Sequence, residues 1–432
     1  MRSVVSRGAF VLATLLAVTP RDARALDLQG ALREVAAANP TLASRRESVE
    51  AARRRVNPAG AWQSPMVDVG VINVPTSGRF DQDPMTMKMI GIEQRVPLFG
   101  ANGMSRQSAG AAADAEGAGW EMAHYEFFAM AWEAYADAYY AGQLAGLSQG
   151  HRGEMDRLVR SARARYDSGN GRLDDLLRAE AEQARTLADA AAFDSETEGA
   201  RARLAALMGR PGAALPDTLE PPPTPMPPAD PAAILAVMND QHPRLRELRF
   251  QRDRYQLAAR AARRTEWPDL QLGASYGFRE PIMGVPQQNM WSATVGFMLP
   301  IFAGSTQEPE AAEMDAMARA AEAELSAAIL ELSQQARGLH ATARADARTV
   351  ALLADTVVVT QRRAVEASQS AYDAGVSDLW RVFEAEHALY GEEIALIRAR
   401  QDLARTTAKL LAVTARGDLL GVTLPEIKRS ER

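Results

Sequence analysis

The feature that most restricts how this chain can fold is an internal repeat of about 200 residues. Three landmarks recur at one offset of 203 residues: Asn39-Pro40 as His242-Pro243, Pro65 as Pro268, and Val96-Pro97-Leu98-Phe99 as Leu299-Pro300-Ile301-Phe302. Two more recur at an offset of 206 residues: Tyr166-Asp167-Ser168-Gly169 as Tyr372-Asp373-Ala374-Gly375, and Leu204-Ala205-Ala206-Leu207 as Leu410-Leu411-Ala412-Val413. Because self-similarity of this kind marks a duplicated structural unit, the two halves are predicted to fold alike.

A proline-rich segment separates the two copies. Residues 221–228 read Pro-Pro-Pro-Thr-Pro-Met-Pro-Pro and cannot be helical, since proline lacks the backbone donor that a helix needs. We therefore predict the following division: a first repeat over residues 26–220, a linker over 221–228, a second repeat over 229–416 and a C-terminal tail over 417–432.

The first residues have the pattern of a secretory signal peptide. Arg2 and Arg7 precede an uncharged run over residues 8–18, and Pro20 and the triplet Ala23-Arg24-Ala25 follow it. We predict that residues 1–25 are the signal peptide and that cleavage follows Ala25. The apolar run is shorter than the roughly 20 residues that cross a bilayer, and no later segment offers the ~18 apolar residues that a membrane helix needs.

Composition excludes several functions. The chain has 49 basic and 55 acidic side chains, a formal net charge of −6, so a broad electrostatic attraction to nucleic acid is not expected. It contains no cysteine, which excludes disulfide scaffolds, zinc fingers and thiol enzymes.

Each copy contains two segments with strand periodicity, predicted over residues 66–74 and 87–96 and over 269–278 and 290–299. Leu270, Leu272 and Tyr276 alternate with small or polar residues, and Val67 and Val69 alternate with Asp68 and Gly70. Each strand has about the 9 to 11 residues that cross a bilayer in a tilted barrel. A soluble sandwich would alternate equally well, so the pattern alone leaves both interpretations open.

Helical segments dominate the rest. Residues 104–166 and 311–372 contain no proline and predict two helices of about 60 residues, close to 90 Å each. Shorter helices are expected over 172–209 and 378–416, after each glycine turn, and within 28–61 and 231–266. Two short helices end to end would span one long helix, which predicts an elongated molecule. Because small barrels need about eight strands, four per chain require several copies to associate.

These landmarks resemble the TolC family of outer-membrane efflux tunnel proteins, which are built from two such repeats. The resemblance rests on the two Pro bends at Pro40 and Pro243, the two strand ends at Pro97 and Pro300, and two Tyr-x-x-Gly turns followed by Leu173 and Leu379. It covers roughly residues 27–416. It implies a mainly α-helical fold with a small β contribution, in which two tandem repeats form a long antiparallel helical barrel across the periplasm.

The resemblance also implies partners. It predicts a homotrimer whose four strands per subunit form a twelve-stranded barrel in outer-membrane lipid, docked on a periplasmic adaptor (membrane fusion) protein and an inner-membrane pump of the RND type. No nucleic acid is expected. The segment over residues 80–88, Phe-Asp-Gln-Asp-Pro-Met-Thr-Met-Lys, is similar to hairpins of the heavy-metal-efflux branch.

In that family the glycine turns form a periplasmic tip, where the first turns of the return helices close the pore mouth. The resemblance places Gly169 and Gly375 in the tip turns and makes gate candidates of Asp174, Asp175, Tyr372, Ser377, Asp378, Arg381 and Glu384. Multidrug members carry an Arg just after the second turn and paired Asp residues beyond it, whereas this chain differs at these positions, so its closing contacts must differ. We hypothesise that Arg381 pairs with Asp174 or Asp175 of a neighbouring subunit; solvated surface charge is the alternative.

Three patterns that suggest chemistry have simpler explanations. Gly273-Ala274-Ser275-Tyr276-Gly277 fits the hydrolase motif G-x-S-x-G, but strand alternation continues through it where that motif needs a sharp turn. Met85, Met87 and Met89 could contact Cu(I), although packing explains them better. The five histidines are dispersed, which argues against a metal site, and His242 is expected to cap a helix before Pro243.

The sequence therefore predicts a channel subunit with no catalytic, cofactor or metal residues. It would form a passive exit for small solutes, drugs or metal ions, through the outer membrane and periplasm, with energy supplied by a partner pump. Two alternatives stay open at this point: the tunnel of a protein secretion system, and a soluble periplasmic coiled-coil scaffold.

Overall fold

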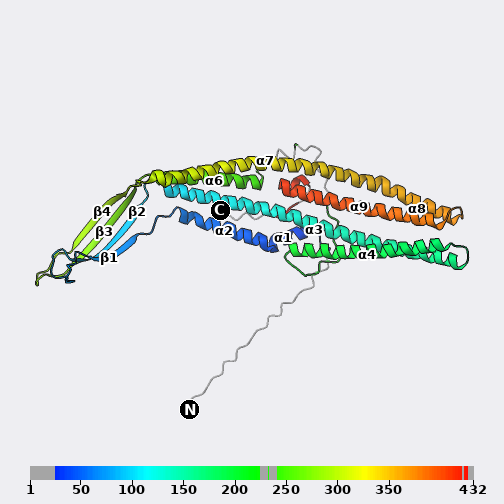
Figure 1. Cartoon of the computed structure of the whole chain (residues 1–432), viewed down its shortest axis with the longest axis horizontal. Helices are drawn as coiled ribbons and strands as arrows, with labels where there is room; N and C mark the ends of the chain where they lie inside the picture. The colour runs from blue at the N-terminus through cyan, green and yellow to red at the C-terminus, as the bar shows by residue number, and fades with distance from the viewer. Residues whose placement is uncertain (1–24, 224–231, 233–240, 421–422, 427–432) are drawn as a thin grey trace, which may run out of the picture.

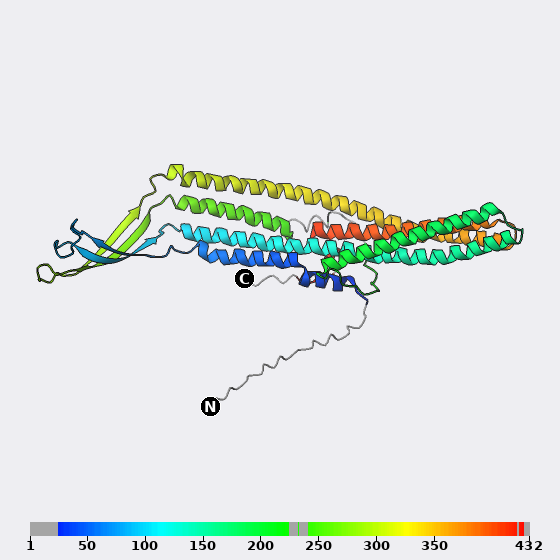
Figure 2. The same ribbon diagram turned by 60° about the horizontal axis from the view of Figure 1, so that its bottom comes forward.

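The computed structural model describes residues 25–223, 232, 241–420 and 423–426. The predicted signal peptide, most of the proline-rich linker and the end of the C-terminal tail lie outside these residues. The described chain is elongated (Figure 1). A four-stranded sheet lies at one end, and at the other end are the two turns that connect antiparallel helices. Helices run side by side between these ends (Figure 2).

The first repeat contains four helices and two strands, in the order α1 Leu28–Ala38, α2 Pro40–Ala59, β1 Met66–Ile72, β2 Met87–Val96, α3 Ala101–Asp167 and α4 Leu173–Leu207. The second repeats the order from its proline bend onward: α6 Pro243–Arg264, β3 Asp269–Arg279, β4 Met290–Met298, α7 Gln307–Leu352, α8 Val358–Asp373 and α9 Leu379–Thr414. The duplicated architecture expected from the sequence is therefore present.

Two of the differences between predicted and observed elements are marked by a local change of the backbone. The helix expected over residues 311–372 is interrupted by a π-helical turn at Leu353–Val357, which separates α7 from α8. The strand expected over 66–74 ends at Ile72, because Asn73 adopts a positive φ of 55° that leaves the extended region. By contrast, β2 covers the same residues as its prediction.

The sheet joins the two repeats. Its strands lie in the order β1-β2-β3-β4, and every neighbouring pair is antiparallel. In the central pair, Gly91 of β2 lies opposite Ser275 of β3, and Ser275 lies opposite Ser292 of β4. Ser275 is therefore in the middle of a paired strand, which is not the strand-turn-helix geometry that a hydrolase nucleophile requires.

The core is centred on α3, which packs against α1, α2, α4, α6 and α9. Alanine is the commonest buried residue of this helix, so neighbouring helices can approach closely, and the largest gaps are filled by fully buried Phe128, Trp132 and Tyr135. These three aromatic side chains of α3 therefore serve packing between helices. The Tyr135 hydroxyl lies 2.7 Å from the carbonyl oxygens of both Leu26 and Glu220, which ties the two ends of the first repeat to α3.

Each repeat contains the same contact between helices, in which the residue before the proline bend bonds to the end of the last helix. We call this contact the joint. Asn39 precedes α2, and its amide Nδ2 donates to the carbonyl oxygen of Leu207 at the end of α4 over 3.1 Å. The equivalent His242 places Nε2 3.0 Å from the carbonyl oxygen of Val413 near the end of α9. Only Asn39 also caps its helix, accepting from the backbone N–H groups of Thr41 and Leu42. His242 occupies the N-cap position of α6, as expected, but its side chain makes no capping bond, because its ring reaches across to α9 instead.

We expect Asn39→Ala to lower the free energy of unfolding by about 2 kcal/mol, since it removes both a helix cap and a buried bond to Leu207. Chemical denaturation in detergent would measure this change. Asn39→Ser keeps a capping oxygen and loses only the bond to Leu207, so it should cost less than Asn39→Ala; an equal or larger cost would contradict this account of the joint.

Candidate functional site

The two glycine turns lie together at the end of the molecule remote from the sheet (Figure 1). Gly169 and Gly375 have φ values of 75° and 73°, the left-handed conformation that glycine adopts without strain. Each glycine N–H donates to the carbonyl oxygen of the tyrosine three residues earlier, Tyr166 or Tyr372, over 2.9 Å. The repeated Tyr-x-x-Gly motif is therefore a repeated helix ending, which turns the chain back toward the sheet.

The acidic gate candidates of the first repeat begin α4. The guanidinium of Arg172 donates to Asp174 over 2.8 Å, and this bond lowers the pKa of the Asp174 carboxyl below its ordinary value. Asp175 is half-buried in the same first turn. Both carboxylates also face the positive end of the α4 dipole, which stabilises them as anions.

The candidates of the second repeat begin α9. Asp378 caps this helix by accepting from the Arg381 backbone N–H over 3.1 Å. The side chains of Arg381 and Glu384 are exposed, and within the described part of this one chain Arg381 forms no ion pair. The Ser377 hydroxyl is buried without a hydrogen-bond partner. The contact between Arg381 and Asp174 or Asp175 of a neighbouring subunit stays a prediction.

An apolar cluster lies beneath the two turns and brings three helices together. It contains Met155 and Val159 of α3, Leu176 of α4, and Leu379 and Phe383 of α9. Cations cover its rim: the Arg165 guanidinium lies 4.8 Å from the ring centre of Tyr372, and that of Arg178 lies 5.1 Å from the ring centre of Trp380. The predicted residue Tyr372 thus supports the tip by packing as well as by its backbone.

A histidine contact lies further from the tip. The ring of His151 on α3 stacks on that of Tyr390 on α9, with centroids 4.0 Å apart and planes 4° from parallel. Burial lowers the pKa of His151 to about 4, and the nearby His387 contributes in the same direction. His387 itself lies 2.6 Å from the Glu182 carboxylate of α4. His151 is therefore neutral at neutral pH, and it is this neutral ring that stacks on Tyr390.

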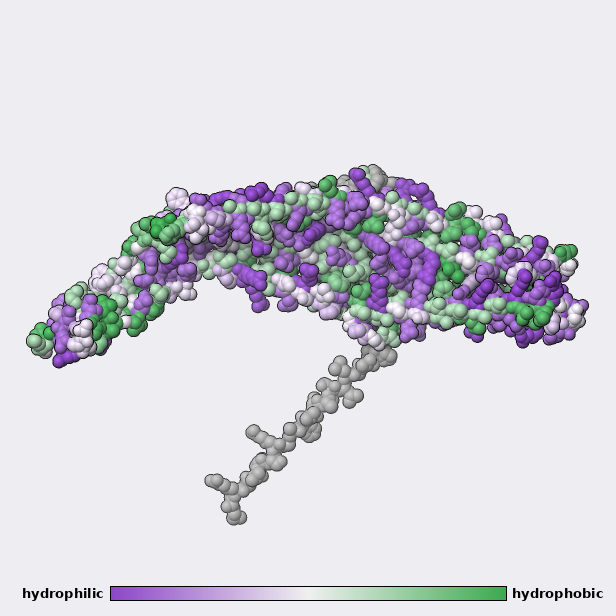
Figure 3. All heavy atoms as spheres, in the orientation of Figure 1, coloured by the Kyte–Doolittle hydropathy of each residue, from purple (hydrophilic) through white to green (hydrophobic). Residues whose placement is uncertain are grey.

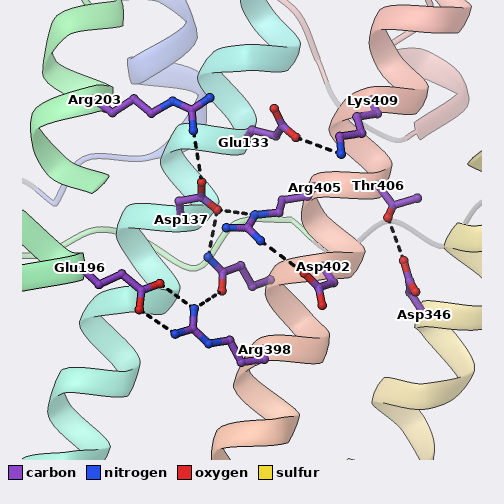
Figure 4. Close-up of polar contacts among 11 residues, drawn as sticks. Glu133, Asp137, Glu196, Arg203, Asp346, Arg398, Asp402, Arg405, Thr406 and Lys409 are labelled. Carbon is purple, nitrogen blue, oxygen red and sulfur yellow. Dashed lines mark hydrogen bonds and ion pairs between the residues drawn. The ribbon is translucent and has the colours of Figure 1, made fainter. Parts of the chain in front are cut away.

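A charged network that the sequence analysis missed joins α3, α4 and α9 near the middle of the molecule (Figure 4). Asp137 of α3 accepts from Arg405 Nε over 2.7 Å and from Gln401 Nε2 over 2.9 Å, both on α9. Arg203 of α4 lies 3.8 Å from the second carboxylate oxygen of Asp137. The Asp137 side chain is only 13% exposed, so this carboxylate is the centre at which both repeats meet.

Two further pairs extend the network. Arg398 of α9 donates two bonds of 2.6 Å to the Glu196 carboxylate of α4, a bidentate pair that lowers the pKa of Glu196. Thr406 donates to Asp346 of α7 over 2.8 Å. No local spacing in the sequence signals these contacts, because each joins residues on helices that are far apart along the chain. The network fixes α9 against α3, α4 and α7 above the tip.

The two faces of the sheet differ in chemistry. Val69, Ile90, Tyr276 and Trp291 form one cross-strand row on one face and are between 41% and 80% exposed. Figure 3 shows hydrophobic atoms collected over this end of the molecule. The opposite face carries small, polar and charged side chains, including Asp68, Gly91, Glu93, Ser275 and Ser292. Such exposure of large apolar side chains marks a surface that another apolar phase covers.

The alternating methionines lie at the far end of the sheet: Met87 and Met89 are on the opposite face of β2, and Met85 lies in the turn before this strand. Met87 is buried, and its Sδ covers Gly277, where a side-chain carbon would lie only 2.4 Å away. Met85 Sδ lies 3.4 Å from Nη2 of Arg279, a cation that opposes binding of a second cation. Packing therefore accounts for Met87, as the sequence favoured.

Among the described helices, none is both long and apolar enough to cross a membrane.

Comparison with solved structures shows that the chain shares its fold with proteins solved as outer-membrane channels. The chain superposes on the outer-membrane channel OprN with a TM-score of 0.74 and 20% identity, covering 90% of this chain and 89% of that one. It superposes on the open state of the Neisseria gonorrhoeae MtrE outer membrane channel with a TM-score of 0.71 and 20% identity, over 90% and 89% of the two chains.

The sequence itself places the chain in a family. It matches the family described as Outer membrane efflux protein twice, over residues 31–210 and 237–416, and the chain therefore belongs to that family. It is 26% identical to the outer membrane efflux protein BepC of Brucella suis biovar 1 (strain 1330), over 98% of this chain and 93% of the relative. The protein is thus an efflux component of the outer membrane, and its relatives are channels rather than enzymes.

We expect Asp137→Asn to lower the free energy of unfolding by about 2 kcal/mol, because it removes the charge that neutralises the Arg405 and Arg203 guanidinium groups in a largely buried setting. Chemical denaturation would measure the loss. Asp402→Asn is the matched control, since Asp402 also pairs with Arg405 but is 61% exposed. Its cost should stay within about 0.5 kcal/mol; equal costs would contradict the central place of Asp137.

We expect the melting temperature to fall as pH decreases from about 6.5 to 4, by at least about 2 °C from His151 alone. Below pH 6.5 the unfolded chain binds a proton at this histidine while the folded chain does not, so protonation favours unfolding. His151→Phe keeps a ring against Tyr390 and should make the pH dependence measurably shallower. An unchanged slope in this variant would show that His151 is not buried as described.

Proposed function

We propose that this chain is the outer-membrane channel subunit of a tripartite efflux system and that three copies form one channel. The observation that carries the proposal is the open sheet. Within the described residues, β1 and β4 each pair on one side only, so the sheet has two free edges next to an exposed apolar face. Free edges of this kind are stable when another chain pairs with them.

Closure by identical copies satisfies these edges. If β4 of one copy pairs with β1 of the next, three copies give a closed barrel of twelve strands, above the roughly eight that a small barrel needs. Its apolar face would lie in lipid and its polar face would line the pore. The helices would continue this pore through the periplasm as a tunnel.

The tip is proposed as the gate and as the end nearest the partners. Arg381 is exposed one turn into α9, and the first turn of α4 carries Asp174 and Asp175 at the same end of the molecule. In a ring of copies, the charges of one chain can therefore approach those of the next, and such exposed pairs can be exchanged for other contacts. A periplasmic adaptor protein and an inner-membrane pump of the RND type would supply those contacts and the energy for transport. The chain itself would pass small solutes, drugs or metal ions, without catalysing a reaction.

We expect the species extracted by detergent from the outer-membrane fraction to have about three times the mass of one chain, as light scattering corrected for detergent would show. A monomeric species that still sediments with the membrane would exclude closure by three copies.

We expect Arg381→Glu to raise the single-channel conductance in a planar bilayer several-fold, because reversal of this charge would repel Asp174 and Asp175 and open the tip. The control is Arg348→Glu, an exposed arginine of α7 far from the tip, which should leave the conductance unchanged. The gate proposal would fail if both variants conducted like the unaltered protein.

A further inference from the structure

Two short helices concentrate positive charge in a chain that is acidic as a whole. Helix α2 contains five arginines against two glutamates, and α6 contains eight arginines against one glutamate and one aspartate. The formal net charge of the full chain is nevertheless −6. The excess of positive charge is therefore local to these two helices and does not follow from overall composition.

Helices α2 and α6 lie next to the sheet. Both helices end where the chain passes into a strand, α2 before β1 and α6 before β3 (Figure 1). The connecting segments carry exposed aromatic side chains, since Trp62 and Trp267 are 58% and 55% exposed. Phe302, between β4 and α7, is 70% exposed. Exposed aromatic residues between an apolar surface and a charged one are typical of the boundary between lipid chains and headgroups.

Several arginines near this boundary have no acidic partner. Arg263 pairs with Asp315 of α7, and Arg252 with Glu322 of the same helix. In contrast, Arg54 and Arg55 near the end of α2, and Arg260 and Arg264 at the end of α6, are exposed and form no ion pair within the described chain. Of the four, only Arg264 lies in the last turn of its helix, where the helix dipole favours a cation, so the dipole does not account for the other three.

We propose that Arg54, Arg55, Arg260 and Arg264 form a surface that binds the phosphate headgroups of anionic phospholipids in the leaflet facing the periplasm. We name these four residues the arginine belt. The inference rests on the membrane placement of the sheet given under the proposed function. Guanidinium groups bind phosphate with two parallel hydrogen bonds, and basic groups close to a membrane surface attract anionic lipid. The belt would hold the helical tunnel at a fixed depth below the sheet.

The test compares lipid preference between two matched variants of one helix. Arg54→Gln with Arg55→Gln removes the belt from α2. Arg45→Gln with Arg46→Gln removes two exposed arginines of the same helix about 13 Å further from the sheet. Each protein is reconstituted in phosphatidylcholine vesicles, and spin-labelled phosphatidylglycerol or phosphatidylcholine is added as the probe. The ratio of the two association constants measures the preference.

The unaltered channel should prefer phosphatidylglycerol several-fold at low salt. The Arg54/Arg55 variant should lose about threefold or more of this preference, as should Arg260→Gln with Arg264→Gln, whereas the Arg45/Arg46 variant should keep it. Equal losses in the belt and control variants would overturn the proposal. If the Arg54/Arg55 variant bound inorganic phosphate more weakly than the unaltered channel but kept its lipid ratio, the site would belong to a free anion, and the proposal would also be overturned.

Conductance distinguishes this inference from the proposed function. In uncharged bilayers the belt variants should conduct like the unaltered protein, because the belt is not part of the pore gate. If neither the unaltered protein nor the Arg381→Glu variant conducted, the channel proposal would fail, while the lipid ratio would still show whether the arginine belt binds anionic lipid.

Discussion

The structure depends on one constraint, that a helix of 67 residues cannot be left without partners along its length. Helix α3 is about 100 Å long and too weakly amphipathic to be stable in water alone. It is covered in sections, by α2 and α6 near the sheet, by α1 near the middle, and by α4 and α9 toward the tip. The joints at Asn39 and His242 lie where one section gives way to the next, so the bends in the short helices follow from the need to cover the long one.

Much of this arrangement could be predicted from the sequence because it depends on local chemistry. Pro40 and Pro243 fix helix starts, the Tyr-x-x-Gly motifs fix the turns at Gly169 and Gly375, and alternation fixes the strand β2. The π-helical turn at Leu353–Val357 could not be predicted in this way, since no proline or glycine marks it and it depends on how α7 packs.

The tip and the central network show the same limit. The sequence placed Asp174 and Arg381 at one end of the molecule, but it could not show that Arg172 already holds Asp174. Arg398 and Glu196 are 202 residues apart, and Arg405 and Asp137 are 268 apart. Which arginine meets which acid is decided by the rotation of each helix about its axis, and that rotation is set by packing rather than by spacing. The net charge of the whole chain was similarly uninformative, because a value of −6 gives no sign of the excess of arginine in α2 and α6.

The position of β2 in the sheet has a consequence for the order of folding. Its second neighbour is β3. Lys88 of β2 forms an ion pair with Glu280, the residue that follows β3, and these two residues are 192 apart in sequence. During export β2 can pair with β1 at once, but its other edge must wait until the whole of α3 and α4 has followed. Contacts this distant in sequence form slowly, and an unpaired strand edge is open to association with other chains in the meantime. Maturation of the sheet is therefore a late and vulnerable step, which ends only when the second repeat has been delivered.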